Sequence, residues 1–166
     1  MTSLARRSLL ILAIVTTIGC DRVTKHLAIT TLAGTLGRTF AGDLIRLEYV
    51  ENTGGFLSLG AGLPPGVRMS LFTFGTGLLL LAVVAFGIRH RWRGWSVLGL
   101  ALFVAGGASN WIDRLARGRV VDFVSVGVGP FRTGIFNVAD VAILAGALVV
   151  AVSELWPRPE AGAAEP

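Results

Sequence analysis

The sequence is poor in the residues on which soluble domains and many enzyme centres depend. Only 15% of its 166 residues are charged, whereas soluble domains carry about 25%. A single cysteine, Cys20, excludes an internal disulfide framework. The two histidines, His26 and His90, form no zinc-ligand spacing with that cysteine, and neither has an evident nucleophile to activate. These shortages argue against a soluble domain, a disulfide scaffold, a zinc enzyme and histidine-assisted nucleophilic catalysis.

Hydrophobic residues are what the sequence has in excess. They make up 53% of the chain, and the mean hydropathy is +0.71. The formal charge of +5 comes almost entirely from arginine, because Lys25 is the one lysine. These arginines are spread along the chain instead of forming a stripe that could bind nucleic acid. We therefore expect an integral membrane protein whose partners include membrane lipids and no nucleic acid.

Four segments have the length and composition of membrane spans. A spanning helix needs roughly 20 mostly apolar residues, and the segments lie at about residues 9–29, 67–88, 95–112 and 138–156. The short link at 89–94 forces the second and third spans into an antiparallel hairpin. The expected fold class is an all-α polytopic membrane protein with one domain over residues 1–156. We expect the Pro/Ala/Glu-rich residues 157–166 to form a disordered cytoplasmic tail.

The distribution of arginines predicts the orientation of these spans. The positive-inside rule places Arg6, Arg7, the 89–93 cluster and Arg158 in the cytoplasm, which puts both termini inside. The predicted cytoplasmic face has six arginines and the opposite face has nine Lys/Arg, but the six are concentrated in short segments. We give this local density more weight than the total count.

An even number of spans collects the acidic residues on one face, whichever way the chain is oriented. Only three of the ten acids fall on the other face. Four of the seven lie in or beside spans, where an ionisable group is costly and is by default a functional hypothesis. The structural alternative is that they snorkel to water or pair with arginines. The seven are Asp21, Asp43, Glu48, Glu51, Asp113, Asp122 and Asp140.

The connections on this face predict a small sheet. Residues 44–50 partly alternate apolar with polar side chains, and residues 119–126 are rich in β-branched residues. Both segments read as short strands. Together they could form a sheet resting on the membrane surface.

The segment 106–114 ends the third span with small and polar residues. Gly106 and Gly107 permit close helix packing, while Asn110 and Asp113 share one helical face. Packing combined with an ion pair between Asp113 and an arginine explains the segment about as well as a catalytic role does.

Two further polar motifs lie on the same face. Asn137 is placed to cap the fourth span, with Asp140 at the third helical position, where a carboxylate favours the helix dipole. Capping explains Asp140 only in part, because the helix is entering hydrocarbon there. Residues 52–56, Asn-Thr-Gly-Gly-Phe, follow a predicted strand and could be a turn and nothing more.

A pair of aspartates is the most economical catalytic centre for this face. When two carboxylates lie close together, one is held protonated, so that one can activate water while the other polarises a carbonyl. A hard cation would need more oxygen ligands than can be assigned, and we expect no metal and no cofactor. From the residues alone, Asp113 and Asp122 are equal candidates. A small ion or proton carrier and a non-catalytic assembly factor are the alternative functions.

Five motifs, in register over roughly residues 9–156, resemble one known family. The first two are Asp21-Arg22-Val23-Thr24-Lys25 and the 52–56 motif, which departs at Gly55-Phe56, where many members have alanine after the glycine. The others are Gly106-Gly107 with Asn110, Asp113 and Arg114, then Val120-Val121-Asp122-Phe123, and finally Phe136-Asn137-Val138-Ala139-Asp140. The sequence is thereby identified as resembling the bacterial lipoprotein signal peptidases (signal peptidase II).

The resemblance implies an aspartyl endopeptidase of the bacterial cytoplasmic (inner) membrane. Such an enzyme would cut diacylglyceryl-modified prolipoproteins just before the lipidated cysteine, at a site near the extracytoplasmic face. The fold implied is four transmembrane helices with a small extracytoplasmic β-cradle, and nothing requires more than a monomer. The implied catalytic pair is Asp122 and Asp140. The implied supporting residues are Asp21, Lys25, Asn52, Gly54, Asn110, Asp113, Arg114, Asn137 and Ala139.

The segment 15–22 itself resembles a lipoprotein signal, because an apolar run with basic residues before it leads to a lone cysteine. Thr17 stands three residues before Cys20, where a leucine-like residue is usual, and three more spans follow. We expect the first span to be retained, with Cys20 as a small packing residue.

Overall fold

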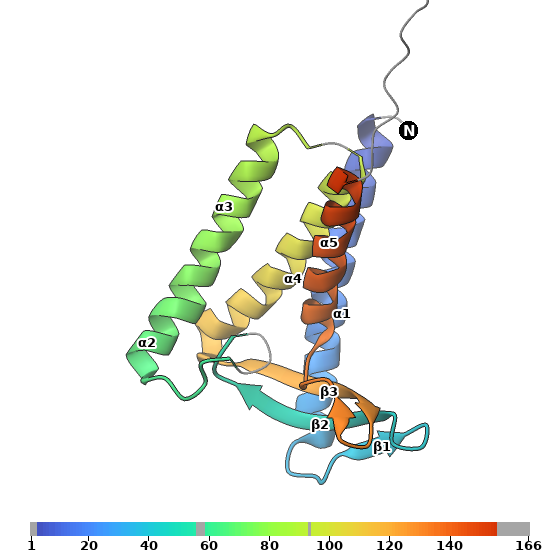
Figure 1. Ribbon diagram of the computed structural model, residues 1–166, viewed down its shortest axis with the longest axis vertical. Coiled ribbons are helices and arrows are strands. Elements are labelled where there is room, and N and C mark those ends of the chain that lie inside the picture. Colours follow the sequence, from blue (N-terminus) through green and yellow to red (C-terminus); the bar gives the residue numbers. More distant parts are fainter. Residues whose placement is uncertain (1–2, 56–58, 93, 156–166) are drawn as a thin grey trace, which may run out of the picture.

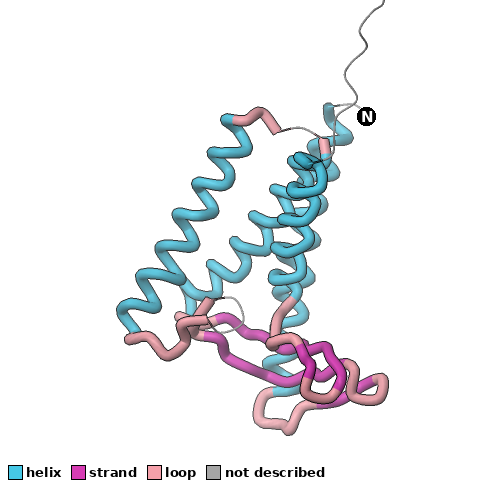
Figure 2. The backbone as a smooth tube through the Cα atoms, viewed as in Figure 1, coloured by secondary structure: helices cyan, strands magenta, loops and turns pink. Residues whose placement is uncertain are grey.

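The helices form an elongated bundle that carries a small sheet at one end. The computed structural model describes residues 3–55, 59–92 and 94–155. Figure 1 shows the helices aligned with the long axis, and Figure 2 shows the strands gathered below them. The first described residues and the end of the last helix both lie at the end opposite the sheet. The sheet therefore lies at one end of the bundle, and the described chain ends lie at the other.

Five α-helices are present among the described residues. The predicted first and fourth spans correspond to α1 (Ser3–Leu32) and α5 (Val138–Leu155). The predicted third span corresponds to α4 (Trp95–Arg117), which ends five residues later than residue 112. Apolar composition underestimated α4 because its last turns are polar, and Gly118, at a φ of +68°, ends the helix.

The predicted second span is one continuous helix with an irregular start. It consists of α2 (Pro65–Met69), the π-helical segment η2 (Ser70–Gly75) and α3 (Thr76–Arg89). A π-helical turn alters the backbone pairing, and here the indole Nε1 of Trp111 donates to the carbonyl oxygen of Thr73 at 2.7 Å. This hydrogen bond attaches the start of the helix to α4.

The predicted antiparallel hairpin is confirmed. Along the contact between α3 and α4, Gly87 faces Leu100, Gly107 faces Leu80, and Gly77 faces Trp111. Residue numbers therefore fall along α3 as they rise along α4, so the two helices are antiparallel. The loop between these helices contains Arg93, which lies outside the described residues.

The predicted close packing at the small residues is also confirmed. A Cβ on Gly106 would collide with the carbonyl oxygen of Ala139 and meet Cγ1 of Ile143 at 3.0 Å. Further along the same contact, a Cβ on Gly146 would lie 2.5 Å from the carbonyl oxygen of Gly99. Glycine thus lets α4 approach the backbone of α5 and brings the polar ends of the two helices together.

The two predicted strands form and pair antiparallel. They are β2 (Ile45–Asn52) and β3 (Val120–Val128), and Val50 lies opposite Asp122 in their register. The sheet has four strands in the order β1-β2-β3-β4. The outer strands β1 (Arg38–Phe40) and β4 (Phe131–Arg132) were not predicted, because they are too short to show an alternating pattern.

The sheet is attached to the bundle through the end of α1. Ala28 and Leu32 of that helix form a buried cluster with Val121 and Phe123 of β3. This packing fixes the start of β3, and with it Asp122, against the helices.

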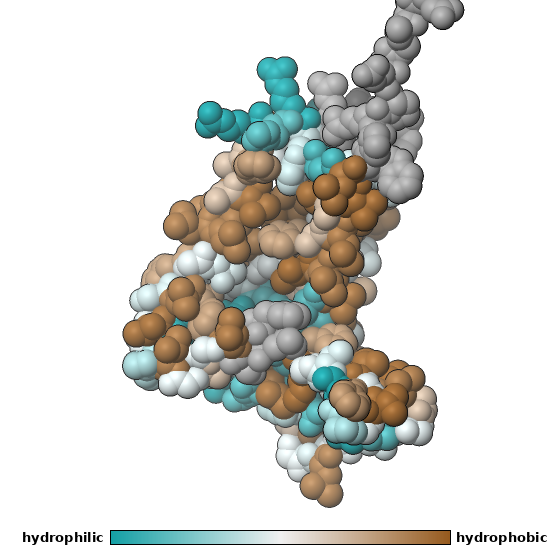
Figure 3. Space-filling model, viewed as in Figure 1, coloured by the Kyte–Doolittle hydropathy of each residue, from teal (hydrophilic) through white to brown (hydrophobic). Residues whose placement is uncertain are grey.

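Large apolar side chains cover the outside of the helices. Leu71, Phe74, Leu78 and Leu81, for example, are all more than half exposed. Figure 3 shows the apolar surface over the upper helices and polar side chains in the hollow between α3 and α5. Three described helices are long and apolar enough to cross a membrane, namely Pro65–Arg89, Trp95–Arg117 and Val138–Leu155.

Cys20 is exposed on α1 and is not a packing residue, so that prediction is wrong. Position on the helix decides this, because Asp21 and Lys25 lie on the face of α1 that is buried. The predicted tail at residues 157–166 lies outside the described residues.

Candidate active site

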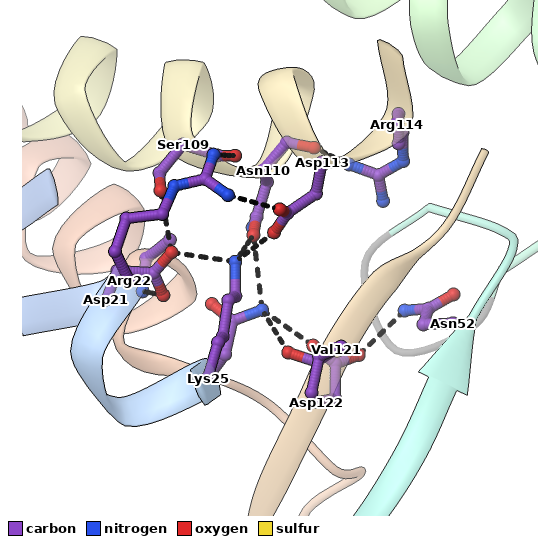
Figure 4. Close-up of polar contacts among 12 residues, drawn as sticks. Asp21, Arg22, Lys25, Asn52, Ser109, Asn110, Asp113, Arg114, Val121 and Asp122 are labelled. Atoms are coloured by element: carbon purple, nitrogen blue, oxygen red, sulfur yellow. Dashed lines mark hydrogen bonds and ion pairs between the residues drawn. The ribbon is translucent and has the colours of Figure 1, made fainter. Parts of the chain in front are cut away.

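Lys25 occupies the centre of a buried ionic cluster between α1 and α4. Its Nζ lies 2.7 Å from Oδ2 of Asp21 and 2.7 Å from Oδ2 of Asp113. It also donates to Oδ1 of Asn110 at 2.7 Å. Figure 4 shows the ammonium group directed into this cluster from α1. The prediction that Asn110 and Asp113 share a helical face is confirmed.

Asp21 joins three helices through its two carboxylate oxygens. Oδ2 accepts a hydrogen bond from Oγ of Ser109 at 2.6 Å, and Oδ1 accepts one from the backbone N–H of Ala139 at 2.9 Å. Asp113 is further neutralised by Nη1 of Arg22. Asp21 and Asp113 thus compensate the buried Lys25 and hold α1 against α4 and α5.

Asp122 and Asp140 have different surroundings, because amide groups bind them. Asp122 accepts hydrogen bonds from Nδ2 of Asn137 at 2.6 Å and from Nδ2 of Asn52 at 2.9 Å. Asp140 accepts a hydrogen bond on Oδ1 from Nδ2 of Asn110 at 2.9 Å. Among the ion pairs of the described residues, none includes either aspartate.

Asn137 links these two aspartates and also begins α5. Its Oδ1 accepts a hydrogen bond from the backbone N–H of Asp140 at 3.0 Å, which confirms the predicted cap. In return, Oδ2 of Asp140 accepts a hydrogen bond from the backbone N–H of Asn137 at 3.1 Å. This reciprocal pattern is that of a capping box. It orients the Asp140 carboxyl group while the Asn137 side chain contacts Asp122.

The loop after β2 is held in place by Asn52 and Arg114. Oδ1 of Asn52 accepts a hydrogen bond from the backbone N–H of Gly54 at 2.9 Å. Nη2 of Arg114 donates to the carbonyl oxygen of Gly54 at 2.7 Å. The motif therefore is a turn, as its composition indicates, and it also places an amide donor on Asp122. Phe56 lies outside the described residues.

Burial sets the protonation behaviour of Asp122. Desolvation raises the pKa of its carboxyl group above the usual range. Hydrogen bonds from Asn52 and Asn137 stabilise the carboxylate and oppose this rise in pKa, as do the charges of Lys25 and Arg114. A carboxyl group in this balance can gain or lose a proton closer to neutral pH than an exposed aspartate.

A cavity of about 230 Å³ lies between α3, α4 and α5 beside Asp140. Asn110, Arg114 and Asp140 line its polar end, and the rest of its wall is mainly apolar, including Leu79, Leu80, Phe103 and Ile143. The cavity can hold an apolar segment next to a carboxyl group.

The structure brings together all of the predicted site residues, Asp21, Lys25, Asn52, Gly54, Asn110, Asp113, Arg114, Asp122, Asn137, Ala139 and Asp140. Sequence reasoning missed Arg22 and Ser109 as partners of buried aspartates. Arg22 pairs with Asp113, and Ser109 donates to Asp21. Each contact joins α1 to α4, so the position of either residue in the sequence does not reveal its partner. The described residues contain no group of three or more His, Cys, Asp or Glu side chains placed to hold a metal ion.

Comparison with known proteins shows the family to which the chain belongs. The family described as Signal peptidase (SPase) II matches residues 13–156. The chain belongs to the signal peptidase II family. It is therefore a protease, and this membership decides against the ion carrier and the assembly factor that the sequence left open.

Relatives of the signal peptidase II chain extend over most of its length. It is 36% identical over 149 residues to a lipoprotein signal peptidase of Desulforapulum autotrophicum, covering 86% of this chain and 90% of the relative. A lipoprotein signal peptidase of Sphingopyxis alaskensis is 34% identical, with 87% and 84% covered. A solved bacterial membrane enzyme, at 26% identity, has a TM-score of 0.78 and covers 91% of this chain and 95% of its own.

Proposed function

We propose that this signal peptidase II removes signal peptides from diacylglyceryl-modified prolipoproteins by hydrolysing the peptide bond just before the lipidated cysteine. In this proposal Asp122 and Asp140 activate the water. One observation carries it: Asp21 and Asp113 form ion pairs with basic residues, whereas Asp122 and Asp140 are bound by amides alone. Of these two pairs, only Asp122 and Asp140 have no cation bound directly to their carboxyl groups.

The chemistry follows from two carboxyl groups that share one proton. The ionised carboxylate takes a proton from water, whose oxygen attacks the carbonyl carbon of the residue before the lipidated cysteine. The protonated carboxyl group donates a hydrogen bond to the carbonyl oxygen as negative charge develops there. When the tetrahedral intermediate collapses, the C–N bond breaks and the cysteine nitrogen takes up the proton that the ionised carboxylate had accepted from water. The products are a free signal peptide carboxylate and the amino group of the lipidated cysteine.

The supporting residues act by orienting this pair. Asn137 contacts both aspartates, and Asn110 contacts Asp140 while it accepts a hydrogen bond from Lys25. The ionic cluster around Lys25 thus holds the amide groups that bind the dyad. Because each amide has one fixed arrangement of donor and acceptor, the carboxyl groups keep their orientation without being neutralised.

In this proposal four helices cross the membrane, namely the three that are long and apolar enough by composition, and α1. We place α1 across the bilayer as well, because it lies along α4 and ends at the same sheet. With 30 residues it is about 45 Å long, which exceeds the hydrocarbon thickness. Residues 1–156 then form one membrane domain with both termini in the cytoplasm, and the sheet is an extracytoplasmic cradle at the surface of the inner membrane. The enzyme acts as a monomer.

This placement suits a lipid-anchored substrate. The diacylglyceryl chains remain in the bilayer, so the modified cysteine lies at the interface, where the polar ends of α4 and α5 meet. The apolar cavity beside Asp140 has the composition needed for an apolar signal-peptide segment. Binding energy from lipid and signal peptide would then position one peptide bond at the dyad.

Cleavage of a lipidated precursor tests the dyad. We expect purified Asp122→Asn and Asp140→Asn each to lose at least about 100-fold in rate, the scale of general acid–base catalysis. Asp43→Asn is the matched control, because Asp43 lies on the same side but pairs with Arg46 at the surface. The control is expected to cleave at the wild-type rate. Folded Asp122→Asn or Asp140→Asn with wild-type activity would make the dyad assignment wrong.

Two further arms examine the substrate and the topology. An unmodified precursor with the same sequence is expected to be cleaved poorly, and sequencing of the product should begin at the lipidated cysteine. Epitope tags at the two termini are expected to resist protease in intact spheroplasts. A tag inserted near Gly42, in the turn before β2, is expected to be digested.

A further inference from the structure

A second cavity, of about 290 Å³, shares Arg114 with the apolar one and has otherwise different lining residues. It is enclosed by the start of the Pro65–Arg89 helix, the end of α4 and the loop after β2. Arg68 and Arg114 line it, together with Thr53 and the apolar residues Met69, Phe72 and Leu115. Two guanidinium groups at an otherwise mainly apolar cavity require an explanation.

Neither arginine forms a direct ion pair among the described residues, although the charges of Asp140, Asp122 and Asp113 act on Arg114 from a greater distance. Nη1 of Arg68 donates to the carbonyl oxygen of Ala61 at 2.7 Å, which leaves other donors of that group available. Nε of Arg114 is buried without any hydrogen-bond partner among the described residues. A buried, unpaired guanidinium N–H is costly, so this group is suited to an acceptor from outside the protein.

The surroundings increase the positive charge. Gly118 lines the cavity between Arg117 and Arg119, and of these two Arg119 pairs with Glu51 at 3.2 Å. The acid nearest to Arg114 in the sequence, Asp113, is already neutralised by Arg22 and Lys25. Arg68 and Arg117 take part in none of the ion pairs of the described residues, so the cavity keeps positive charge that an anion with several acceptor oxygens can compensate.

We propose that this cavity binds the phosphate group of a membrane phospholipid, with Arg68 and Arg114 as its ligands. Guanidinium groups bind phosphate oxygens through paired N–H donors and are well suited to planar, bidentate contacts. Met69, Phe72 and Leu115 would contact the glycerol and the first acyl carbons. The ligand is thus a bilayer lipid that lies beside the substrate and is distinct from it.

The position of Arg68 favours a lipid over a free ion. Arg68 is the only charged residue between Pro65 and Ile88, and it lies in the first turns of a helix apolar enough to span the bilayer. Arginine side chains near the ends of spanning helices reach towards the membrane interface, where the lipid phosphates lie. The diacylglyceryl group of a precursor is neutral and could not compensate two guanidinium charges.

Phosphate binding would also act on the loop beside the dyad. Arg114 donates from Nη2 to the carbonyl oxygen of Gly54, in the turn that Asn52 stabilises. A phosphate on the Nε edge of Arg114 would hold that side chain in place between the lipid and the loop. Bound lipid would therefore help to keep Asn52 on Asp122.

The test measures lipid binding directly. Full-length protein in detergent is titrated with a short-chain phosphatidylglycerol, and bound lipid is counted by native mass spectrometry. We expect Arg68→Gln to weaken binding at least tenfold, and Arg68→Lys to weaken it less because the charge remains. Arg38→Gln is the matched control, since Arg38 is exposed on β1, and we expect it to bind like wild type. Retention of the wild-type thermal transition shows that each variant is folded.

Three outcomes would overturn the proposal. The first is equal lipid binding by wild type and both Arg68 variants. The second is binding of inorganic phosphate with no binding of phosphatidylglycerol, which would make the site one for a free anion. The third is binding of a short acidic peptide in preference to the lipid. Because the readout is lipid bound and not precursor cleaved, it is independent of whether the proposed dyad is right.

Discussion

Asn137 donates a 2.6 Å hydrogen bond from Nδ2 to Oδ1 of Asp122, which lies on β3, 15 positions earlier in the chain. The same asparagine caps the helix that carries Asp140. One side chain thus sets the relation between a strand and a helix, and with it the relation between the two carboxyl groups. The placement of these two carboxyl groups therefore depends on a residue that also begins a helix.

Lys25→Met is expected to destabilise the protein strongly. The substitution leaves Asp21 and Asp113 buried without their shared cation. Breaking a buried ion pair in this way costs about 3–5 kcal/mol. Unfolding in detergent, followed by circular dichroism, measures the loss. Combining Lys25→Met with Asp21→Asn should restore part of the stability, and a double variant no more stable than Lys25→Met would contradict the electrostatic explanation.

Asn52→Ala is expected to move the pH dependence of cleavage. Asn52 stabilises ionised Asp122, so its removal raises the pKa of Asp122 further. If Asp122 is the carboxylate that accepts the proton of water, the acidic limb of kcat/KM moves to higher pH. If Asp122 is the protonated partner, the basic limb moves to higher pH instead. Thr39→Ala serves as the control, because Thr39 is exposed on β1. A profile of Asn52→Ala unchanged in both limbs would argue against the role of Asn52.

Gly106→Ala is expected to disturb the site through packing alone. The new methyl group would meet the backbone at Ala139 and the side chain of Ile143, and would push the start of α5 away from α4. Overpacking of this kind costs about 1–3 kcal/mol. We also expect slower cleavage, because Asp140 moves with α5. Gly19→Ala is the matched control, since nothing lies within 4 Å of its added Cβ. Equal stability and activity of the two variants would refute the close-packing argument.

Cys20→Ala is expected to be neutral. The thiol is exposed on α1, and exposed substitutions change stability by less than about 0.5 kcal/mol. Activity should equal that of wild type. The protein isolated from membranes should also keep the residues before Cys20, because α1 runs through this position without interruption. Mass spectrometry of the N-terminus measures this, and loss of the first 19 residues would show that the segment is a cleaved signal.

The helices could be predicted because their signals are local. Long apolar runs indicated the segments that became α2–α3, α4 and α5, and β-branched residues indicated β2 and β3. The polar end of α4 was underestimated, since Asp113 and Arg114 do not look apolar although the helix continues through them. Cys20 was placed on the wrong face because composition does not tell which side of a long apolar helix meets its neighbours.

The sequence by itself determined the class of protein, the antiparallel hairpin and the cap at Asn137. Each of these depends on residues that lie close together in the chain. Only the tertiary structure decided which aspartates pair with basic side chains. Asp113 and Asp122 were equal candidates in the sequence, but Asp113 meets Lys25, 88 positions away, whereas Asp122 meets Asn52, 70 positions away. Such partners are brought together by packing between distant segments, and no local pattern specifies them.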